Sequence, residues 1–165
     1  MNKYLAFDLG ASSGRGIIGT LDNGKISLKE VNRFKNTMTL MRGSYYWDFC
    51  QIFENIKEGI IKTVRLKENP CSIGVDTWGV DYGLLDEKGD IIGMPYAYRD
   101  HRTDSAIEEV SKLIPKEELY GKTGIQFMQF NSLFQLHAAI RDGYPGMTIA
   151  KTLLFMPDLV NYYLS

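Results

Sequence analysis

The sequence has few cysteines, few histidines and no long apolar run, and each of these absences excludes a class of protein. Cys50 and Cys71 are the only cysteines among 165 residues. Two thiols outside any ligand motif favour a reducing cytoplasm over a disulfide framework. The two histidines, His101 and His137, are too far apart in the sequence to predict a zinc site. No apolar run has membrane-spanning length, so we expect no membrane partner.

An excess of one sign of charge is also missing. The chain has 19 Lys and Arg against 20 Asp and Glu, a formal net charge of −1, and no long basic run. Phosphate backbones require clustered cations, so nucleic acid is not an expected partner. The hydrophobic fraction of 44% and the charged fraction of 24% are ordinary for a globular protein. Residues 1–165 are therefore expected to form a single domain, beginning with a strand rather than a signal sequence.

Short apolar runs in the first half of the chain predict a mixed β-sheet. Four strands are expected, at residues 3–9, 14–21, 25–34 and 73–81. Asn23-Gly24 predicts a hairpin between the second and the third, because both residues tolerate positive φ. A helix before the fourth strand would let that strand return parallel to the first, in the order β-β-β-α-β. Asp8 and the segment Asp76–Asp81 would then end at one edge of the sheet, where ligands commonly bind.

The remaining segments add a long helix, an inserted hairpin and C-terminal helices. Asp48 followed by Gln51 predicts the N-terminal cap of a helix that runs to about Glu68. Its buried stripe is expected to contain Phe49, Ile52, Phe53, Ile56, Ile60 and Val64. Residues 36–46 are expected to form a loop, and residues 84–92 a hairpin that extends the fourth strand. Further helices are expected around residues 107–114 and 133–140, and from Pro157 onward.

The segment Asp8–Arg15 has the features of a phosphate-binding turn. It joins two strands through glycines, which let a bound group approach the main chain closely. Backbone N–H groups, the hydroxyls of Ser12 and Ser13, and the Arg15 guanidinium would face one point. Asp8 stands at a strand end and suits a hard cation such as Mg²⁺. The alternative is a polar hairpin turn with a solvated aspartate, because short glycine motifs are weak signals.

Other polar and aromatic residues leave alternatives open. Asp76 is expected to be structural or an indirect metal ligand, and Asp81 could face either way. The segment Tyr98–Arg102 either orients a polyhydroxylated ligand or a phosphate, or forms a salt-bridged start of a helix. His137, on an apolar helix face, is expected to be a satisfied core histidine. Aromatic residues beside glycine or polar positions suit either a sugar site or the core: Trp47, Trp78, Tyr98 and Phe130. No nucleophile has a partnered base, which argues against acyl transfer.

Several motifs, in the same order along the whole chain, resemble the FGGY family of carbohydrate kinases. Residues 8–15 are similar to the family's N-terminal phosphate loop. The segments Asp76–Asp81, Tyr98–Thr103 and Gly124–Phe127 resemble the rhamnulokinase branch in particular, and residues 156–158 resemble the start of the helix that closes this lobe. The resemblance implies an α/β fold, the actin-like ATPase or ribonuclease H-like lobe, in agreement with the β-β-β-α-β order.

The resemblance also implies an activity and its site residues. The activity is transfer of the γ-phosphoryl group of ATP to the 1-hydroxyl of L-rhamnulose. Asp8 would hold Mg²⁺ through water, and Gly79, Tyr98 and Phe130 would contact the sugar. The ATP phosphates would meet Gly10, Ala11, Ser12, Ser13, Gly14 and Arg15.

The family's catalytic base is expected beyond Ser165. These kinases have two lobes, and the aspartate that takes the proton from the sugar hydroxyl belongs to the second. Phosphoryl transfer depends on positioning and charge stabilisation from both lobes, so the chain by itself is expected to be inactive and to need its C-terminal lobe as partner. Apolar surface that faces the cleft is expected to favour self-association of the isolated chain.

Three alternatives to a rhamnulose kinase lobe remain at this point. The lobe could serve another ketose or polyol, such as L-fuculose or xylulose. It could be a sugar-binding module without catalysis. It could also be a two-metal nuclease of the ribonuclease H-like fold, with Asp8, Asp76 and either Glu54 or Glu58 as ligands.

Overall fold

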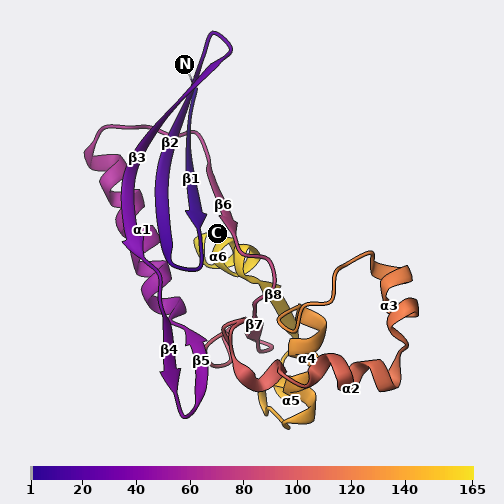
Figure 1. Ribbon diagram of the computed structural model, residues 1–165. Coiled ribbons are helices and arrows are strands. Elements are labelled where there is room, and N and C mark those ends of the chain that lie inside the picture. The colour runs from indigo at the N-terminus through magenta and orange to yellow at the C-terminus, as the bar shows by residue number, and fades with distance from the viewer. Residues whose placement is uncertain (1) are drawn as a thin grey trace. The chain divides into compact units, whose positions relative to one another are not determined.

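The computed structural model describes residues 2–165, which divide into two compact units (Figure 1). The first unit contains the described residues up to Met38, together with Asp48–Gly79 and Met156–Ser165. The second unit contains Thr39–Trp47 and Val80–Phe155. Each unit is described by itself.

The first unit is a four-stranded mixed sheet with helices. Its elements are β1 (Asn2–Leu9), β2 (Ser13–Asp22), β3 (Lys25–Lys35), α1 (Phe49–Arg65), β6 (Ile73–Thr77) and α6 (Met156–Leu164). The strand order is β3-β2-β1-β6, with β1 antiparallel to β2 and parallel to β6. The predicted β-β-β-α-β sheet is therefore confirmed. The fourth strand is shorter than predicted, because β6 ends at Thr77 and Asp81 belongs to the second unit.

One face of this sheet is buried beneath α1, which runs along it in Figure 1. Leu5, Phe7 and Leu9 alternate along β1 and are almost completely buried. Gly59 lets the helix approach closely, because a Cβ at this position would lie 2.7 Å from Cε1 of Phe7. Tyr4, Ala6 and the other alternate residues of β1 lie on the opposite face.

Local signals predicted the limits of α1 better than its buried stripe. The backbone N–H of Gln51 donates to Oδ1 of Asp48 over 2.9 Å, which confirms the predicted cap. The buried residues are Phe49, Ile52, Ile56, Gly59 and Thr63, so three of the six predicted residues are buried and Phe53, Ile60 and Val64 are not. The helix ends at Arg65 rather than near Glu68. The predicted stripe missed Gly59 and Thr63 because small residues allow α1 to pack closely on the sheet. A count of apolar residues overlooks such positions.

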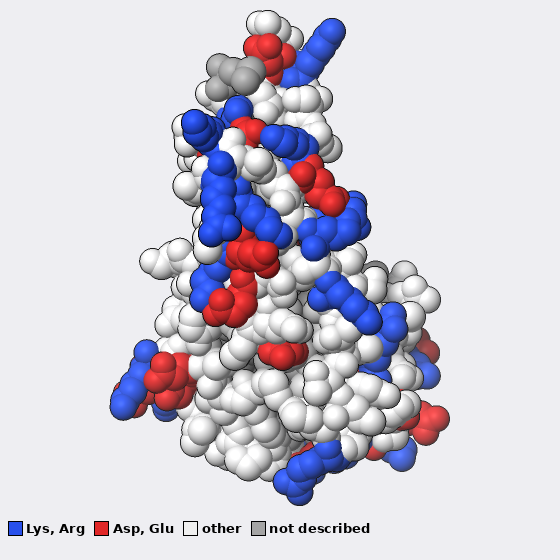
Figure 2. All heavy atoms as spheres, turned by 90° about the vertical axis from the view of Figure 1, so that its left-hand side faces the viewer, with Lys and Arg blue, Asp and Glu red and all other residues white. Residues whose placement is uncertain are grey.

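Acidic and basic side chains are interspersed on the face of the first unit that Figure 2 shows. Within α1, Lys57 pairs with Glu54 over 2.5 Å and Lys62 pairs with Glu58 over 2.9 Å. On β3, Arg33 pairs with Glu30 over 2.6 Å. Exposed pairs of this kind contribute little to stability.

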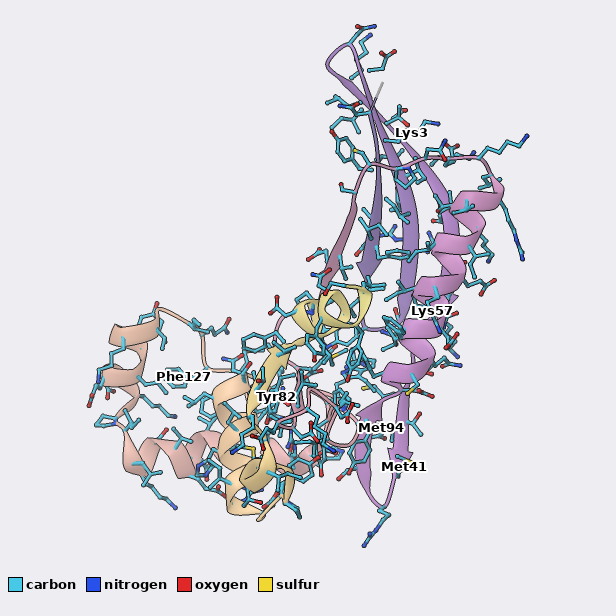
Figure 3. The ribbon with its side chains drawn as sticks, turned by 180° about the vertical axis from the view of Figure 1, so that it is seen from behind. Lys3, Met41, Lys57, Tyr82, Met94 and Phe127 are labelled. Carbon is cyan, nitrogen blue, oxygen red and sulfur yellow. The ribbon has the colours of Figure 1, made fainter. Side chains whose placement is uncertain are left out.

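The second unit combines short strands with a group of helices. Its elements are β4 (Met38–Met41), β5 (Ser44–Trp47), β7 (Tyr82–Leu85), the 3₁₀-helix η1 (His101–Thr103), α2 (Ala106–Leu113), α3 (Lys116–Thr123), α4 (Ser132–Arg141), α5 (Gly146–Ile149) and β8 (Thr152–Phe155). The first residue of β4, Met38, is assigned to the first unit. Helices α2 and α4 pack together around Ala106, Val110 and Phe134. Phe127, labelled in Figure 3, packs against this cluster with its ring centroid 6.3 Å from that of Phe134.

Two sequence predictions in this unit were wrong. Residues 36–46 do not form a loop, because β4 and β5 form a hairpin whose turn, Arg42-Gly43, has positive φ at both residues. Residues 84–92 were expected to extend the fourth strand. Instead, β7 pairs antiparallel with β8. A short hairpin is present at residues 84–92, closed by an isolated bridge between Leu85 and Ile91 and by a hydrogen bond from the Ile92 N–H to the Leu84 carbonyl over 2.8 Å. Strands β7 and β8 are distant in the sequence, so no local pattern connects them.

A polar cluster connects α2 to α4. Glu109 accepts hydrogen bonds from Ser105, Arg141 and, over 2.8 Å, Nε2 of His137. The Ser105 hydroxyl contributes most, followed by His137 and Arg141, and together they lower the pKa of Glu109 to about 2. His137 is thus satisfied, as predicted, although it is half-buried rather than a core residue.

The Glu109 cluster predicts acid sensitivity. Because the pKa of Glu109 is lower in the folded chain than the ordinary value of about 4.3, its stabilising contribution is complete above that value. The contribution is lost as the pH falls towards about 2. We expect the melting temperature of Glu109→Gln to fall less than that of the wild type between pH 5 and pH 2.5. The neighbouring Glu108→Gln is the control, and equal slopes for Glu109→Gln and the wild type would contradict the prediction.

No helix in the described residues 2–165 is long and apolar enough to cross a membrane.

Candidate functional site

Asp8 and Arg15 face each other across the β1–β2 hairpin. They are register partners, and the Arg15 guanidinium is ion-paired with Oδ2 of Asp8. Asp76 is the register partner of Asp8 on the other side, in the parallel strand β6. Directly opposite residues share a face of the sheet, so Asp76, Asp8 and Arg15 form a row on the face away from α1. The prediction that Asp8 and Asp76 end at the same edge is confirmed.

Asn36 fixes the turn between β1 and β2. The N–H of Gly10 donates to the Ser13 carbonyl over 2.8 Å, closing the turn. The Asn36 side-chain amide donates to the Gly10 carbonyl over 2.8 Å, and its backbone N–H donates to the Ser12 carbonyl over 3.0 Å. Asn36 is itself buried, so the carbonyl groups of the turn are held towards the protein.

The same arrangement leaves donors for a ligand. Among residues 2–165, the N–H groups of Ala11 and Ser12 donate to no backbone or side-chain acceptor. Successive N–H groups in a turn attract an anion, and the Ser12 and Ser13 side chains lie in the same turn. With the Arg15 guanidinium on the adjacent strand, these groups fit the phosphates of a nucleotide. The half-exposed Asp8 carboxylate fits Mg²⁺, which needs only one or two carboxylates beside phosphate oxygens and water.

Gly14 has a packing role in this turn. A Cβ on Gly14 would lie only 2.2 Å from Cζ of Phe34, so the ring of Phe34 occupies the space that a side chain would need. Gly14 is buried and pairs with Leu9 of β1, on the face covered by α1. Gly14 therefore keeps the start of β2 close to β3, whereas Ser13 and Arg15 lie on the opposite face.

In the second unit, Tyr98 and Phe130 lie side by side. Their ring centroids are 5.5 Å apart at an interplanar angle of 63°, and both residues are half-buried. The Trp47 ring is 6.3 Å from that of Tyr98 and is completely buried. Gly79, the third residue expected to contact the sugar, is exposed in the first unit and has nothing within 4 Å of a Cβ built on it.

Of the segment Tyr98–Arg102, Asp100 and Arg102 have structural partners. Asp100 accepts from the backbone N–H of Tyr45 over 2.7 Å and caps η1 through the N–H of Arg102. The Arg102 guanidinium lies 3.8 Å from the Tyr96 ring centroid and donates to Gln135 over 2.9 Å. For these two residues, the alternative of a structural helix start is the better description.

Arg102 also borders a small, partly open pocket in the second unit. Tyr82, which Figure 3 labels, lines it together with Tyr96 and Tyr144. Burial raises the pKa of all three tyrosines, so their hydroxyls remain protonated at neutral pH. The Tyr144 hydroxyl donates to the Ile92 carbonyl over 3.1 Å, so this hydroxyl has a structural role in the pocket wall.

The metal ligands required for a nuclease are not assembled. Glu54 and Glu58 are both ion-paired with lysines of α1. Within residues 2–165, no three His, Cys, Asp or Glu side chains gather as they would around a metal ion. The two-metal alternative therefore has no support from the described residues.

The comparison with protein families identifies the family of the chain. The model described as "FGGY family of carbohydrate kinases, N-terminal domain" matches residues 3–165. The chain belongs to the FGGY family of carbohydrate kinases. Curated FGGY relatives include the rhamnulokinase of Bacteroides thetaiotaomicron, 44% identical over 163 residues, and that of Mannheimia succiniciproducens, 44% identical over 162 residues. The matches cover 99% and 97% of this chain but only 34% of each relative, so the chain spans about a third of their length.

Solved structures of FGGY kinases share the fold. The gluconate kinase of Lactobacillus acidophilus superposes with a TM-score of 0.84 over 98% of this chain and 32% of its own, at 14% identity. The xylulose kinase of Rhodospirillum rubrum gives a TM-score of 0.80 over 98% of this chain and 34% of its own, at 18% identity. The predicted actin-like ATPase fold is therefore confirmed.

Sequence reasoning did not identify two residues that shape these sites. Asn36 was assigned to a loop, yet it holds the turn after β1. Gln135 was counted only as part of a helix, yet its buried amide bonds to the Phe130 carbonyl and to Asp81. A polar side chain on an otherwise apolar helix face was the available signal for Gln135, whereas Asn36 gave none.

Proposed function

We propose that residues 1–165 form the N-terminal lobe of a two-lobed kinase that transfers the γ-phosphoryl group of ATP to the 1-hydroxyl of L-rhamnulose. The main support is the turn after β1, where two N–H donors, Asp8 and Arg15 lie together in a chain of the FGGY family. The identity of 44% to relatives called rhamnulokinase supports this sugar over L-fuculose or xylulose.

In this proposal the turn binds the phosphates of ATP. The backbone from Gly10 to Gly14 and the guanidinium of Arg15 receive the phosphate oxygens, which carry the negative charge. Asp8 holds Mg²⁺ through water, and Asp76 beside it adds a second carboxylate to the same face. Bound Mg²⁺ neutralises charge that develops on the transferred group.

Nucleotide binding would replace the contact between Asp8 and Arg15. Without nucleotide the two charges neutralise each other across the hairpin. Mg²⁺–ATP offers a partner to each, a cation for the carboxylate and a phosphate for the guanidinium. The ion pair therefore keeps both side chains at the site until the nucleotide binds. Breaking the pair reduces the free energy of nucleotide binding.

The sugar would lie against Tyr98 and Phe130 of the second unit. Gly79, in the first unit, keeps the role of sugar contact that the family resemblance implies. Aromatic faces suit the C–H surface of a sugar, and neighbouring main-chain groups can bond its hydroxyls. The base that accepts the proton of the 1-hydroxyl is assigned to a second lobe. The roles in this lobe are therefore to bind and orient, which accounts for much of the catalysis of phosphoryl transfer.

Two further properties belong to this proposal. The isolated chain is proposed to self-associate, and Ile26 and Leu28, both exposed on β3 of the first unit, are candidates for this contact. Cys50 and Cys71 are both free, which suits a reducing cytoplasm.

A chimera tests the proposal. This chain replaces the matching N-terminal residues of the Bacteroides thetaiotaomicron rhamnulokinase, and a coupled ADP-release assay measures activity with L-rhamnulose, L-fuculose and xylulose. We expect the chimera to phosphorylate L-rhamnulose best, and the 165-residue chain by itself to show less than about 1% of that rate, because the base and half of the charge stabilisation are missing.

The parent rhamnulokinase and its separately purified C-terminal part are the controls. A soluble, folded chimera that phosphorylates none of the sugars would overturn the proposed function. A preference for L-fuculose or xylulose would change the substrate and keep the kinase. Activity of the isolated chain close to that of the parent would overturn the assignment of the base to a second lobe.

A further inference from the structure

Asp81 carries a carboxylate that is completely buried in the second unit. Its Oδ2 accepts from Nε1 of Trp47 over 2.6 Å and from the backbone N–H of Tyr98 over 3.1 Å. Its Oδ1 accepts from the side-chain amide of Gln135 over 2.7 Å. Three donors from three separate segments thus compensate for the loss of water around one charge.

Gln135 is the second buried polar residue of this network. Its Nε2 donates to Asp81 and, over 2.9 Å, to the carbonyl of Phe130. Its Oε1 accepts from the guanidinium of Arg102 over 2.9 Å. Because a cation lies on the oxygen side and a carboxylate on the nitrogen side, the amide can adopt only one orientation.

The Asp81–Gln135 pair therefore holds both aromatic residues through their main chains. Asp81 binds the N–H of Tyr98, and Gln135 binds the carbonyl of Phe130. The two backbone groups are connected through a single 2.7 Å hydrogen bond between the side chains. The rings themselves are half-buried, with centroids 5.5 Å apart.

A purely structural role would not require these groups. Apolar side chains of similar volume often fill a buried site with equal or greater stability than a buried charge does. What an apolar core cannot supply is a directional bond that fixes a particular backbone group. In this chain, such bonds fix the N–H of Tyr98 and the carbonyls of Phe130 and, over 3.2 Å, Val80. Two of these three backbone groups belong to the aromatic residues assigned to the sugar.

We infer that Asp81 and Gln135 are positioning residues, which set the spacing and angle of Tyr98 and Phe130 as one wall of the sugar site. This inference rests on the proposed function, in which these two rings contact the sugar. Both side chains are buried and reach Tyr98 and Phe130 through main-chain groups, so their proposed role is to position these residues rather than to contact the reacting atoms. The ligand is a neutral polyhydroxylated sugar that presents a C–H face to the rings.

The test measures steady-state kinetics in the chimera. Gln135→Met preserves the length and most of the volume of the side chain but removes its hydrogen bonds. We expect the KM for L-rhamnulose to rise about tenfold, while the KM for ATP stays within twofold, because only the sugar wall is disturbed. Asp81→Asn is the milder second variant, with a rise of about threefold expected.

Thr103→Val is the matched control, because Thr103 is also buried and polar in the second unit but bonds to the Asp100 carbonyl. This variant should lower the melting temperature without changing the KM for the sugar. A double-mutant cycle with Phe130→Leu measures whether the effects of the two substitutions on KM are coupled. General destabilisation of the chain would not produce such coupling. Gln135→Met should raise the KM less than twofold in the Phe130→Leu background, if Gln135 acts through Phe130.

The outcomes separate the inference from the proposed function. If the wild-type chimera fails to phosphorylate L-rhamnulose, the proposed function fails first. If the wild type is active and the KM for the sugar is unchanged in a folded Gln135→Met or Asp81→Asn variant, the inference is wrong and the kinase assignment stands. Additive effects of Gln135→Met and Phe130→Leu would also overturn it.

Discussion

Asp8→Ala is expected to lower the kcat of the chimera roughly 100-fold at saturating ATP and 1 to 10 mM Mg²⁺, in line with the loss typical when an outer partner of a metal site is removed. Asp8 supplies the carboxylate nearest to the turn whose N–H groups are assigned to the phosphates. Without it, Mg²⁺ loses a charged acceptor for its bound water, and Arg15 loses its counter-charge. Varying Mg²⁺ should show that a higher concentration is needed for the half-maximal rate.

Two further variants show whether the loss of kcat is specific to Asp8 and whether it comes from the charge. Asp22→Ala removes an exposed carboxylate from the far end of the same hairpin and should leave kcat within twofold of the wild type. Asp8→Asn keeps the shape and removes the charge, so a loss similar to that of Asp8→Ala would assign the effect to charge. Unchanged kcat and unchanged Mg²⁺ dependence in Asp8→Ala would contradict the metal assignment.

Trp47→Ala is expected to destabilise the isolated chain by about 3–5 kcal/mol, the range for removing a large buried aromatic side chain. Trp47 is completely buried at the end of β5, and its indole N–H is a donor to the buried Asp81. The substitution therefore creates a cavity and takes one donor from a carboxylate that water cannot reach. Urea unfolding followed by circular dichroism at 222 nm measures the change.

Trp47→Phe separates the two contributions, because it keeps most of the packing and removes only the donor. A cost of about 1–3 kcal/mol is expected for that change. Leu40→Ala is the surface control from the neighbouring strand β4, where Leu40 is 58% exposed, and it should change stability by less than about 0.5 kcal/mol. A cost below about 1 kcal/mol for Trp47→Ala would show that the site collapses or fills with water.

The sequence predicted the features that are encoded locally. Asn23-Gly24 has positive φ at both residues, so the hairpin it forms is decided by two adjacent backbone conformations. Asp48 caps α1 through a residue three positions away. The mixed sheet could be predicted because the apolar runs, the helix and the fourth strand follow one another in the order that a parallel return requires.

The features that escaped prediction depend on distant partners. Tyr82 of β7 pairs with Phe155 of β8, and no local pattern connects them. The environment of Asp81 is decided by Trp47, 34 positions earlier, and by Gln135, 54 positions later. Its burial was therefore left open from the sequence, and so was the reason why Tyr98 and Phe130 lie together. The residues proposed to bind phosphate could be named from the sequence, whereas Asn36, which holds the turn, could not.

The two tryptophans of the chain belong to different units. Trp47 is in the second unit and Trp78 is in the first. With Trp78 replaced by Phe, fluorescence reports on the second unit alone, and with Trp47 replaced by Phe it reports on the first. The chain thus carries its own pair of optical reporters. Comparing the fluorescence midpoint of each variant with its midpoint by circular dichroism at 222 nm measures whether the two units unfold as one cooperative body or in separate steps.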